Sequence, residues 1–361
     1  MTAIRTSFID DETRPTIFPL IDTHTHFDAP VFDSDRGKQA QLAYDQGVRH
    51  LVLVGYLHRH FDRLYETERL LNERWQLNEE LRLVEEITSI TEKDIHQKES
   101  HYQKQSLPKA HIALGLHPFY IEQHTEAHLE NMAQMLNKKR PLTIGEIGLD
   151  TFTDAMKQPE MFAKQQHFFN AQLDMAVEHQ LPVMLHIRKA HAEALALLKA
   201  HTYDAHKLGG IAHSFSGGVQ EAKAFAKLGF KLGVTGQITN PNAKKLRLAI
   251  QVAVDIYGIE CLVIETDCPD MTPIMCQTSG NTLDSGLYGS LYDKASALGQ
   301  SPDNEWGDTP AYNRNVPANL PYVLLSLSEL LNVPPAVLAE QLWHNSCMAL
   351  QTKWHYPIYK I

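Results

Sequence analysis

The sequence predicts an α/β fold, a TIM (β/α)8 barrel, on three observations. Eight short apolar or β-branched runs recur along the 361 residues, and most are followed by a turn and a segment of helical periodicity. The runs are apolar almost throughout, which suits parallel strands buried on both faces. An open, doubly wound sheet is the alternative. The eight runs are 19–26, 50–55, 111–118, 142–150, 182–188, 209–215, 230–236 and 261–267.

The helices between these runs are recognised by apolar stripes. Phe162, Gln166, Phe169 and Leu173 fall on one face of a predicted helix before the fifth run. These stripes are typical of core packing and do not indicate a cofactor site. No internal repeat or composition boundary divides the chain, so we expect one domain over 1–361.

Two connections are longer than a barrel needs, 58–110 after the second strand and 268–312 after the eighth. The first contains a helical pattern through Leu64, Leu71 and Trp75, and then a polar stretch. The second is rich in Gly, Ser, Asn and Asp, so it is either a functional lid or a disordered insertion. We expect both enlarged loops to border the mouth of the pocket.

Composition limits the class of protein. A hydrophobic content of 43% and a charged content of 21% are ordinary for a globular chain. No stretch approaches the roughly 18 to 20 apolar residues of a membrane span, and the first residues lack a signal-peptide core. Four cysteines without paired metal spacing indicate reduced thiols. The expectation is a soluble, cytoplasmic protein with no membrane partner.

The net charge of −10 argues against a broad basic surface for duplex nucleic acid. A small anionic group could still bind locally. Bound divalent cations would add positive charge where carboxylates gather, so the total charge says little about a pocket.

The first strand carries a pair of candidate metal ligands. Side chains alternate along a strand, so Asp22, His24 and His26 project to the same side, and the two imidazoles can share one ion. Asp22 could support an imidazole as a hydrogen-bond acceptor.

Four further polar residues end later strands: Glu146 in the fourth, His186 in the fifth, His213 in the sixth and Asp267 in the eighth. The carboxyl ends of barrel strands meet at one face, where the active site of this fold is found. Any one of them alone could be a hydrogen-bonded barrel histidine or a helix cap. Together with the first-strand pair they favour two divalent cations.

The motifs resemble those of the TatD family of metal-dependent hydrolases, within the amidohydrolase superfamily. GEIGLD is identical to the family signature, and DTHTHFD resembles its opening motif with Phe27 in place of Leu. GLHP, LHIR, HSFSG, ETDCP and RNVP match the later motifs in order over nearly the whole barrel.

The resemblance implies a ligand set and a reaction. His24, His26 and Asp267 would bind one metal and His186 and His213 the other, while Glu146 bridges them and His117 faces the substrate. Family members mostly cleave phosphodiester bonds of DNA. The enlarged loops depart from the family pattern, so they put the substrate in doubt.

Catalytic roles follow from chemistry at such a site. Two ions favour a bridging hydroxide near neutral pH, and Asp267 is the candidate to accept the proton of water. Glu146 is expected to bridge, not to act as a free base. His117 could donate to a phosphate oxygen or to the leaving group, or be a turn residue before Pro118.

Three residues near these positions keep two interpretations each. Arg188 and Arg314 are candidates to bind a substrate phosphate, or each could pair with a carboxylate. Asp150 could support a ligand or cap the following segment, and we favour the cap.

The sequence therefore predicts a divalent-metal-dependent hydrolase of ester bonds, a probable phosphodiesterase or deoxyribonuclease acting on DNA or a small phosphodiester. One alternative is hydrolysis of a small amide or lactone on the same site. Another is a metal-stabilised binding protein without turnover. Mg²⁺, Mn²⁺ and Zn²⁺ all suit the mixed ligands. No protein partner is implied, and the oligomeric state stays open.

Overall fold

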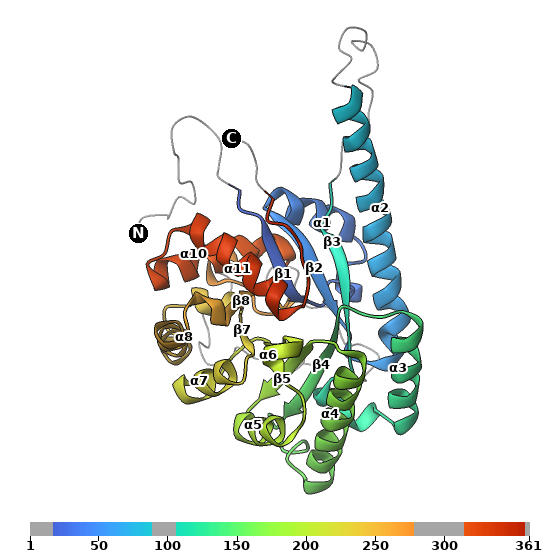
Figure 1. Cartoon of the computed structure of the whole chain (residues 1–361), viewed down its shortest axis with the longest axis vertical. Helices are drawn as coiled ribbons and strands as arrows, with labels where there is room; N and C mark the ends of the chain where they lie inside the picture. The colour runs from blue at the N-terminus through green and yellow to red at the C-terminus, as the bar shows by residue number, and fades with distance from the viewer. Residues whose placement is uncertain (1–16, 89–105, 278–313, 358–361) are drawn as a thin grey trace.

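The computed structural model describes residues 17–88, 106–277 and 314–357 (Figure 1). It confirms a TIM-like barrel of eight parallel strands, ordered β1 to β8 as in the sequence. The strands are β1 Leu20–Thr25, β2 Val48–Val54, β3 Lys109–Leu114, β4 Thr143–Asp150, β5 Val183–Arg188, β6 Ile211–Ala212, β7 Lys231–Val234 and β8 Leu262–Ile264.

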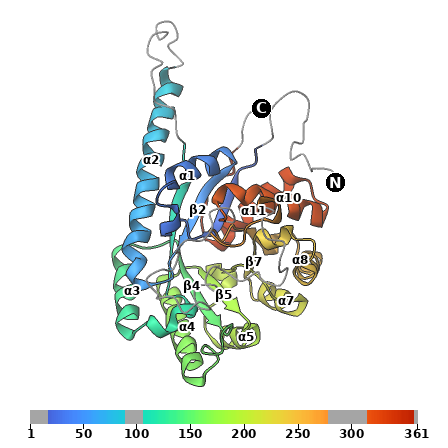
Figure 2. The ribbon, with the colours of Figure 1, turned by 180° about the vertical axis from the view of Figure 1, so that it is seen from behind.

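Helices surround the strands on the outside, as both views of the chain show (Figures 1 and 2). Their apolar faces pack on the strands and form one large core. The helices are α1 Arg36–Asp45, α2 Phe61–Thr88, α3 Glu126–Lys138, α4 Pro159–His179, α5 His191–Ala200, α6 Ala205–Leu208, α7 Val219–Lys227, α8 Lys244–Tyr257, α10 Leu320–Leu331 and α11 Pro335–Ala349.

The barrel closes between β1 and the segment that follows β8. The Asp267 backbone N–H donates to the His24 carbonyl at 2.9 Å, so the two residues lie side by side. The buried Asp22 carboxylate reinforces this seam, because it accepts from the backbone N–H of Thr266 at 2.8 Å and from its hydroxyl at 2.5 Å. Asp22 therefore ties β1 to the segment that follows β8. The expectation that Asp22 supports an imidazole is wrong, because both of its oxygens bond Thr266.

Two glutamines of α4 anchor the loops at the carboxyl ends of β3 and β4. Gln172 bonds both the N–H and the carbonyl of Leu116, at 2.7 and 3.2 Å. Gln165 does the same for Asp150, at 2.8 and 2.9 Å. The predicted stripe placed Gln166 in the core, but it is partly exposed, and Gln165 and Gln172 are the buried pair.

The long helix of the enlarged connection 58–110, α2, extends away from the predicted pocket mouth. Asn72 of α2 pairs with both backbone polar groups of Ala110 near the start of β3. The helix then continues to Thr88, about four further turns beyond the amino-terminal end of that strand. Figure 1 shows this part of α2 projecting from the barrel. The expectation that the whole enlargement borders the mouth is wrong, because the helix runs antiparallel to its strands.

The second enlarged connection, 268–312, is described only as far as residue 277. Its described part contains one short helix, η7 Ile274–Cys276. The expected lid or insertion over 278–312 lies outside the described residues.

No helix among the described residues is by itself long and apolar enough to span a membrane. Pro317–Leu331 and Pro335–Ala349 reach that character only as a pair, and the pair is bent by 111°.

Two histidines near the amino-terminal ends of the strands are covered by the carboxyl-terminal segment. His50 of β2 and His111 of β3 share a hydrogen bond between their rings at 3.0 Å. The Trp354 ring stacks on both, with centroid distances of 4.0 and 4.4 Å. Burial lowers the pKa of His50 to about 3, and it lowers the pKa of His111 well below the ordinary value.

This cluster predicts a loss of stability in acid. Between about pH 6.5 and pH 3 the unfolded chain binds protons at these histidines that the folded chain does not, so the free energy of unfolding falls as pH falls. His111→Gln should make this slope shallower by up to about 1.4 kcal/mol per pH unit, one proton. Urea unfolding at several pH values measures it. His344→Gln, on an exposed helix face, is the control, and equal slopes for the two variants would contradict the prediction.

Candidate metal centre

The Glu146 carboxylate lies at the centre of the predicted ligands. Glu146 belongs to β4 and is 1% exposed inside the barrel. Its Oε1 lies 2.7 Å from His186 Nδ1, 2.7 Å from His213 Nε2 and 3.1 Å from His117 Nε2. Residues from four strands or strand ends therefore meet at one carboxylate oxygen.

The other oxygen of Glu146 faces the first-strand pair. Oε2 lies 3.4 Å from His24 Nε2 and 3.6 Å from His26 Nε2. The two Nε2 atoms are themselves 3.4 Å apart. One carboxylate thus separates two groups of imidazole nitrogens, one group at each oxygen.

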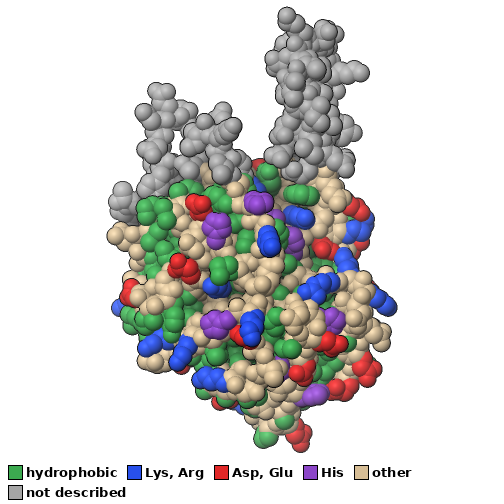
Figure 3. Space-filling view, in the orientation of Figure 1, with side chains coloured by type: hydrophobic (Ala, Val, Ile, Leu, Met, Phe, Trp, Pro, Cys, Tyr) green, Lys and Arg blue, Asp and Glu red, His purple; other side chains and the backbone are tan. Residues whose placement is uncertain are grey.

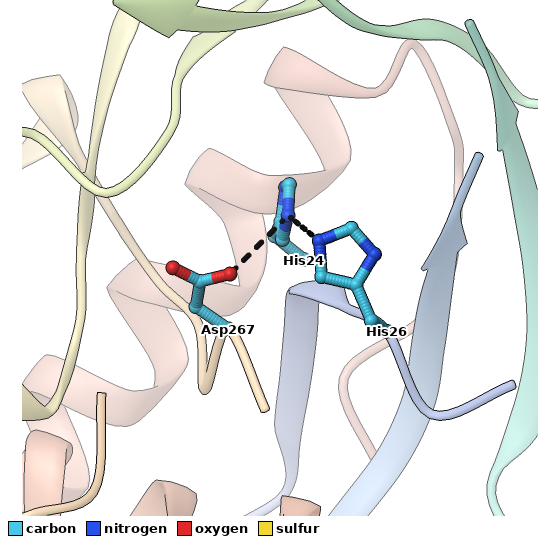
Figure 4. A group of neighbouring side chains, drawn as sticks. All are labelled: His24, His26 and Asp267. Carbon is cyan, nitrogen blue, oxygen red and sulfur yellow. Dashed lines mark hydrogen bonds and ion pairs between the residues drawn. The ribbon is translucent and has the colours of Figure 1, made fainter. Parts of the chain in front are cut away.

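Asp267 completes the group around His24 and His26 (Figure 4). Its Oδ1 lies 3.5 Å from His24 Nε2, and potential ligand atoms of the three residues lie within 4.8 Å of one another. Asp267 has a φ of 53°, a left-handed conformation that costs a non-glycine residue energy and is concentrated at functional sites.

The outer nitrogens of these rings set the tautomers. His26 Nδ1 lies 3.1 Å from the Val54 carbonyl, which can only accept, so His26 donates there. His24 Nδ1 lies 2.8 Å from the Met184 sulfur and donates to it. Both rings therefore turn an unprotonated Nε2 toward Glu146, which is the form that binds a metal.

Glu265, which the sequence analysis did not single out, lies behind His213 at ion-pair distance, and His213 Nδ1 has no hydrogen-bond partner among the described residues. Glu265 Oε1 lies 3.5 Å from His213 Nδ1 and accepts from the Ser214 backbone N–H at 2.5 Å. Its Oε2 accepts from the Thr23 hydroxyl at 3.1 Å. A Cβ at Gly233 would lie 2.3 Å from Glu265, so the side chain fits only beside glycine. The sequence signal was a glutamate inside the apolar eighth strand.

Asp150 fulfils both interpretations of the sequence. Its Oδ2 lies 2.9 Å from His186 Nε2, which leaves Nδ1 of that ring toward Glu146. Its Oδ1 accepts from the Phe152 backbone N–H at 2.7 Å, the contact of a turn cap.

The proton of a neutral His117 ring faces Glu146, whereas His24, His26 and His186 can face it with an unprotonated nitrogen. Its Nδ1 accepts from the Phe119 backbone N–H at 2.9 Å, so the neutral ring carries its proton on Nε2, the atom that faces Glu146. Nearby, His124 Nε2 lies 3.0 Å from the His117 carbonyl and donates to it. In this tautomer the neutral ring of His117 points an N–H at Glu146, although His117, Glu146 and His186 also form a group that could hold a metal ion once Nε2 loses that proton.

Charge is strongly coupled across the centre. Burial alone would raise the pKa of Glu146, but the facing imidazoles hold that pKa well below its ordinary value. Burial opposes a charge on His213, yet the carboxylates of Glu146 and Asp267 raise its pKa well above the ordinary value. Burial lowers the pKa of His26 to about 4, and it raises the pKa of Asp267 well above its ordinary value.

The donor set fits divalent cations. His186 and His213 each place a ring nitrogen 2.7 Å from Glu146 Oε1. If that nitrogen is unprotonated, its lone pair repels the carboxylate oxygen. An added proton or a nearby metal ion would remove this repulsion. Glu146 Oε2 is buried and has no hydrogen-bond partner among the described residues. A buried oxygen in that state is expensive, and a cation among three nitrogen and carboxylate groups would satisfy it.

The two predicted phosphate-binding arginines lie in different settings. The Arg314 guanidinium pairs with Asp35 at 2.6 and 3.1 Å and donates to the Val31 carbonyl. The Arg188 guanidinium lies 3.5 Å from the centre of the Phe152 ring. Arg188 follows His186 by two residues on β5, so the two side chains share a face of the strand. Arg314 is therefore paired with a carboxylate, one of its two expected roles. Substrate binding by either arginine stays a prediction.

Comparison with known proteins shows which family this chain resembles. The family model described as TatD-related DNase matches residues 21–351. The uncharacterised metal-dependent hydrolase YjjV of Escherichia coli is 34% identical over 254 residues, 70% of this chain and 80% of its own. A relative in Citrobacter rodentium named 3'-5' ssDNA/RNA exonuclease TatD is 28% identical over 321 residues, 89% of this chain and 93% of its own.

A solved structure of one of these relatives has a similar fold. The crystal structure of YjjV from Escherichia coli superposes with a TM-score of 0.65 at 28% identity, and it covers 92% of this chain and 98% of its own. The barrel, the ordered motifs and the convergence on Glu146 agree with this likeness. The chain belongs to the TatD family of metal-dependent hydrolases, within the amidohydrolase superfamily.

Proposed function

We propose that this protein is a divalent-metal-dependent phosphodiesterase that cleaves single-stranded nucleic acid, with DNA as the first substrate to test. The observation that carries the proposal is the position of Glu146, whose two oxygens face two separate groups of ligand nitrogens. A relative named for exonuclease action on ssDNA and RNA supports the substrate class.

The proposal assigns each ligand to one of two ions. His24, His26 and Asp267 would hold one ion and His186 and His213 the other, with Glu146 between them. When bound, such ions lower the pKa of water and polarise a phosphoryl oxygen. The mixed nitrogen and oxygen donors suit Zn²⁺ and Mn²⁺, and Mg²⁺ is the harder alternative.

Asp267 and His117 would transfer the protons of the reaction. Asp267, whose Oδ1 lies 3.5 Å from His24 Nε2, would accept the proton of the attacking water. His117 carries its proton on Nε2, so it would donate to a phosphate oxygen or to the leaving oxygen. Arg188, beyond His186 on β5, would bind a phosphate oxygen.

A substrate panel tests the proposed function. We expect the metal-free protein to be inactive, and protein loaded with Mn²⁺, Zn²⁺ or Mg²⁺ to hydrolyse single-stranded DNA and bis(p-nitrophenyl) phosphate. Duplex DNA should be cleaved more slowly because the chain carries a net charge of −10. Turnover of lactones or amides without any phosphodiesterase activity would identify the alternative hydrolase, and metal binding without any turnover would identify a binding protein.

Removal of the central charge tests the ligand assignment. Glu146→Gln should weaken the binding of both ions by at least about 100-fold, beyond the effect of losing a supporting contact. Isothermal titration with Mn²⁺ measures both affinities. Glu126→Gln, at the exposed start of α3, is the matched control. Two unchanged affinities in Glu146→Gln would refute the bridging position.

Removal of the donor proton tests His117. His117→Asn should keep both metal affinities within about threefold and lower kcat on DNA by about 10²- to 10⁴-fold, the usual contribution of acid catalysis. The loss should be smaller on bis(p-nitrophenyl) phosphate, because p-nitrophenolate leaves without a proton. Equal losses on both substrates would exclude protonation of the leaving group.

A further inference from the structure

An aromatic ring at the mouth of the site carries two cations. The Arg188 guanidinium carbon lies 3.5 Å from the centre of the Phe152 ring, and Lys189 Nζ lies 4.4 Å from it. Phe152 and Arg188 are partly exposed and Lys189 is exposed. All three follow or end β4 and β5, at the face of the barrel where the ligands converge.

A strained backbone brings the second cation to the ring. Consecutive side chains of a strand point to opposite faces, so Lys189 would ordinarily point away from the face that Arg188 uses. Lys189 instead has a φ of 55°, in the left-handed region that disfavours a long side chain. Thr151 holds this conformation, since its N–H donates to the Arg188 carbonyl at 3.0 Å and its hydroxyl to the Lys189 carbonyl at 2.8 Å.

One carboxylate couples this ring to a predicted metal ligand. Asp150 Oδ2 meets His186 Nε2 at 2.9 Å, while Asp150 Oδ1 accepts from the Phe152 N–H at 2.7 Å. Asp150 is also the strand partner of Arg188 across β4 and β5. The backbone of Phe152 and the strand position of Arg188 are therefore both held next to Asp150, which contacts His186.

The charge at this point is local. Asp154, the exposed carboxylate closest in sequence, pairs with Lys157 at 2.8 Å, and the charge of Lys189 also lowers its pKa. Although burial opposes it, the hydrogen bond with His186 and the charge of Arg188 lower the pKa of Asp150. On the face seen in Figure 3, Lys and Arg side chains are interspersed with acidic and apolar ones. Two like charges beside one ring repel each other, and a phosphate would add to the compensation that Asp150 and Asp154 already supply.

We propose that Phe152, Arg188 and Lys189 form a subsite for the phosphate next to the scissile one in a single-stranded nucleic acid. The subsite rests on the proposed function, and it specifies a substrate with at least two consecutive phosphates. Phe152 is the positioning residue, because its ring holds both cations by cation–π contact. Arg188 and Lys189 supply the charge that meets the phosphate.

Two variants and one control test the subsite. Lys189→Met removes a charge but keeps the length of the side chain, and Phe152→Leu removes the aromatic face but keeps apolar bulk. Lys207→Met removes an exposed lysine of α6, which precedes β6 and so lies toward the opposite end of the barrel. The probe is a short fluorescein-labelled phosphorothioate oligonucleotide, titrated by anisotropy with the Mn²⁺-loaded protein at several salt concentrations.

The subsite predicts weaker binding in both variants and not in the control. Lys189→Met and Phe152→Leu should each weaken oligonucleotide binding by about threefold to tenfold. Lys189→Met should also reduce the slope of log K against log salt by about 0.7, the value for one phosphate contact on a single strand. KM for DNA should rise by a similar factor, and the loss on bis(p-nitrophenyl) phosphate, which has one phosphate, should be several-fold smaller.

Three outcomes would overturn the subsite: no oligonucleotide binding by the parent protein, variants that bind like Lys207→Met, or equal losses on both substrates. A different result would reject the proposed function alone. If the parent protein binds the oligonucleotide, the two variants weaken that binding, and no metal supports hydrolysis, the subsite stands without the phosphodiesterase.

Discussion

The Glu146 charge, enclosed in the barrel, is the constraint on which the rest of the centre depends. A carboxylate in that position is strongly destabilising unless positive charge surrounds it, and five imidazoles do so within 3.6 Å. Against the effect of burial, nearby carboxylates raise the pKa of His186 and of His213, so added protons on these rings could supply that positive charge. Protonation of the rings and the binding of an ion would be alternative ways to satisfy the same buried charge, so any metal affinity of the centre would depend on pH.

The contacts behind the rings decide what each ring can do. The Val54 carbonyl and the Asp150 carboxylate accept from His26 and His186 on the side away from Glu146, so those two rings can present lone pairs to the centre. The Phe119 N–H instead donates to His117 Nδ1, so the neutral His117 ring presents an N–H to Glu146. Neighbours outside the centre thus decide which predicted ligand rings could bind an ion and which ring could donate a proton.

The sequence predicted the barrel and the convergence because both follow from local pattern. Apolar runs mark the strands, and a polar residue at the carboxyl end of such a run lies at the common face of the barrel. Glu265 was missed because its role depends on a cavity beside Gly233, which no spacing reveals. Asp22 was misplaced because its partner Thr266 lies 244 residues away in the chain. Long-range pairings of this kind are set by closure of the barrel.

The direction of the long helix α2 is another feature that the sequence pattern did not predict. Helical periodicity predicted the helix, but its direction follows from the βαβ connection, which carries the added turns toward the amino-terminal ends of the strands. The predicted ligands and the His117 ring lie at the opposite ends of the strands. The added turns of α2 therefore lie away from the centre, whereas a change of φ at Lys189 would redirect a charge beside it. On the proposed function, substrate selection would depend on the residues that end the strands and not on these turns of α2.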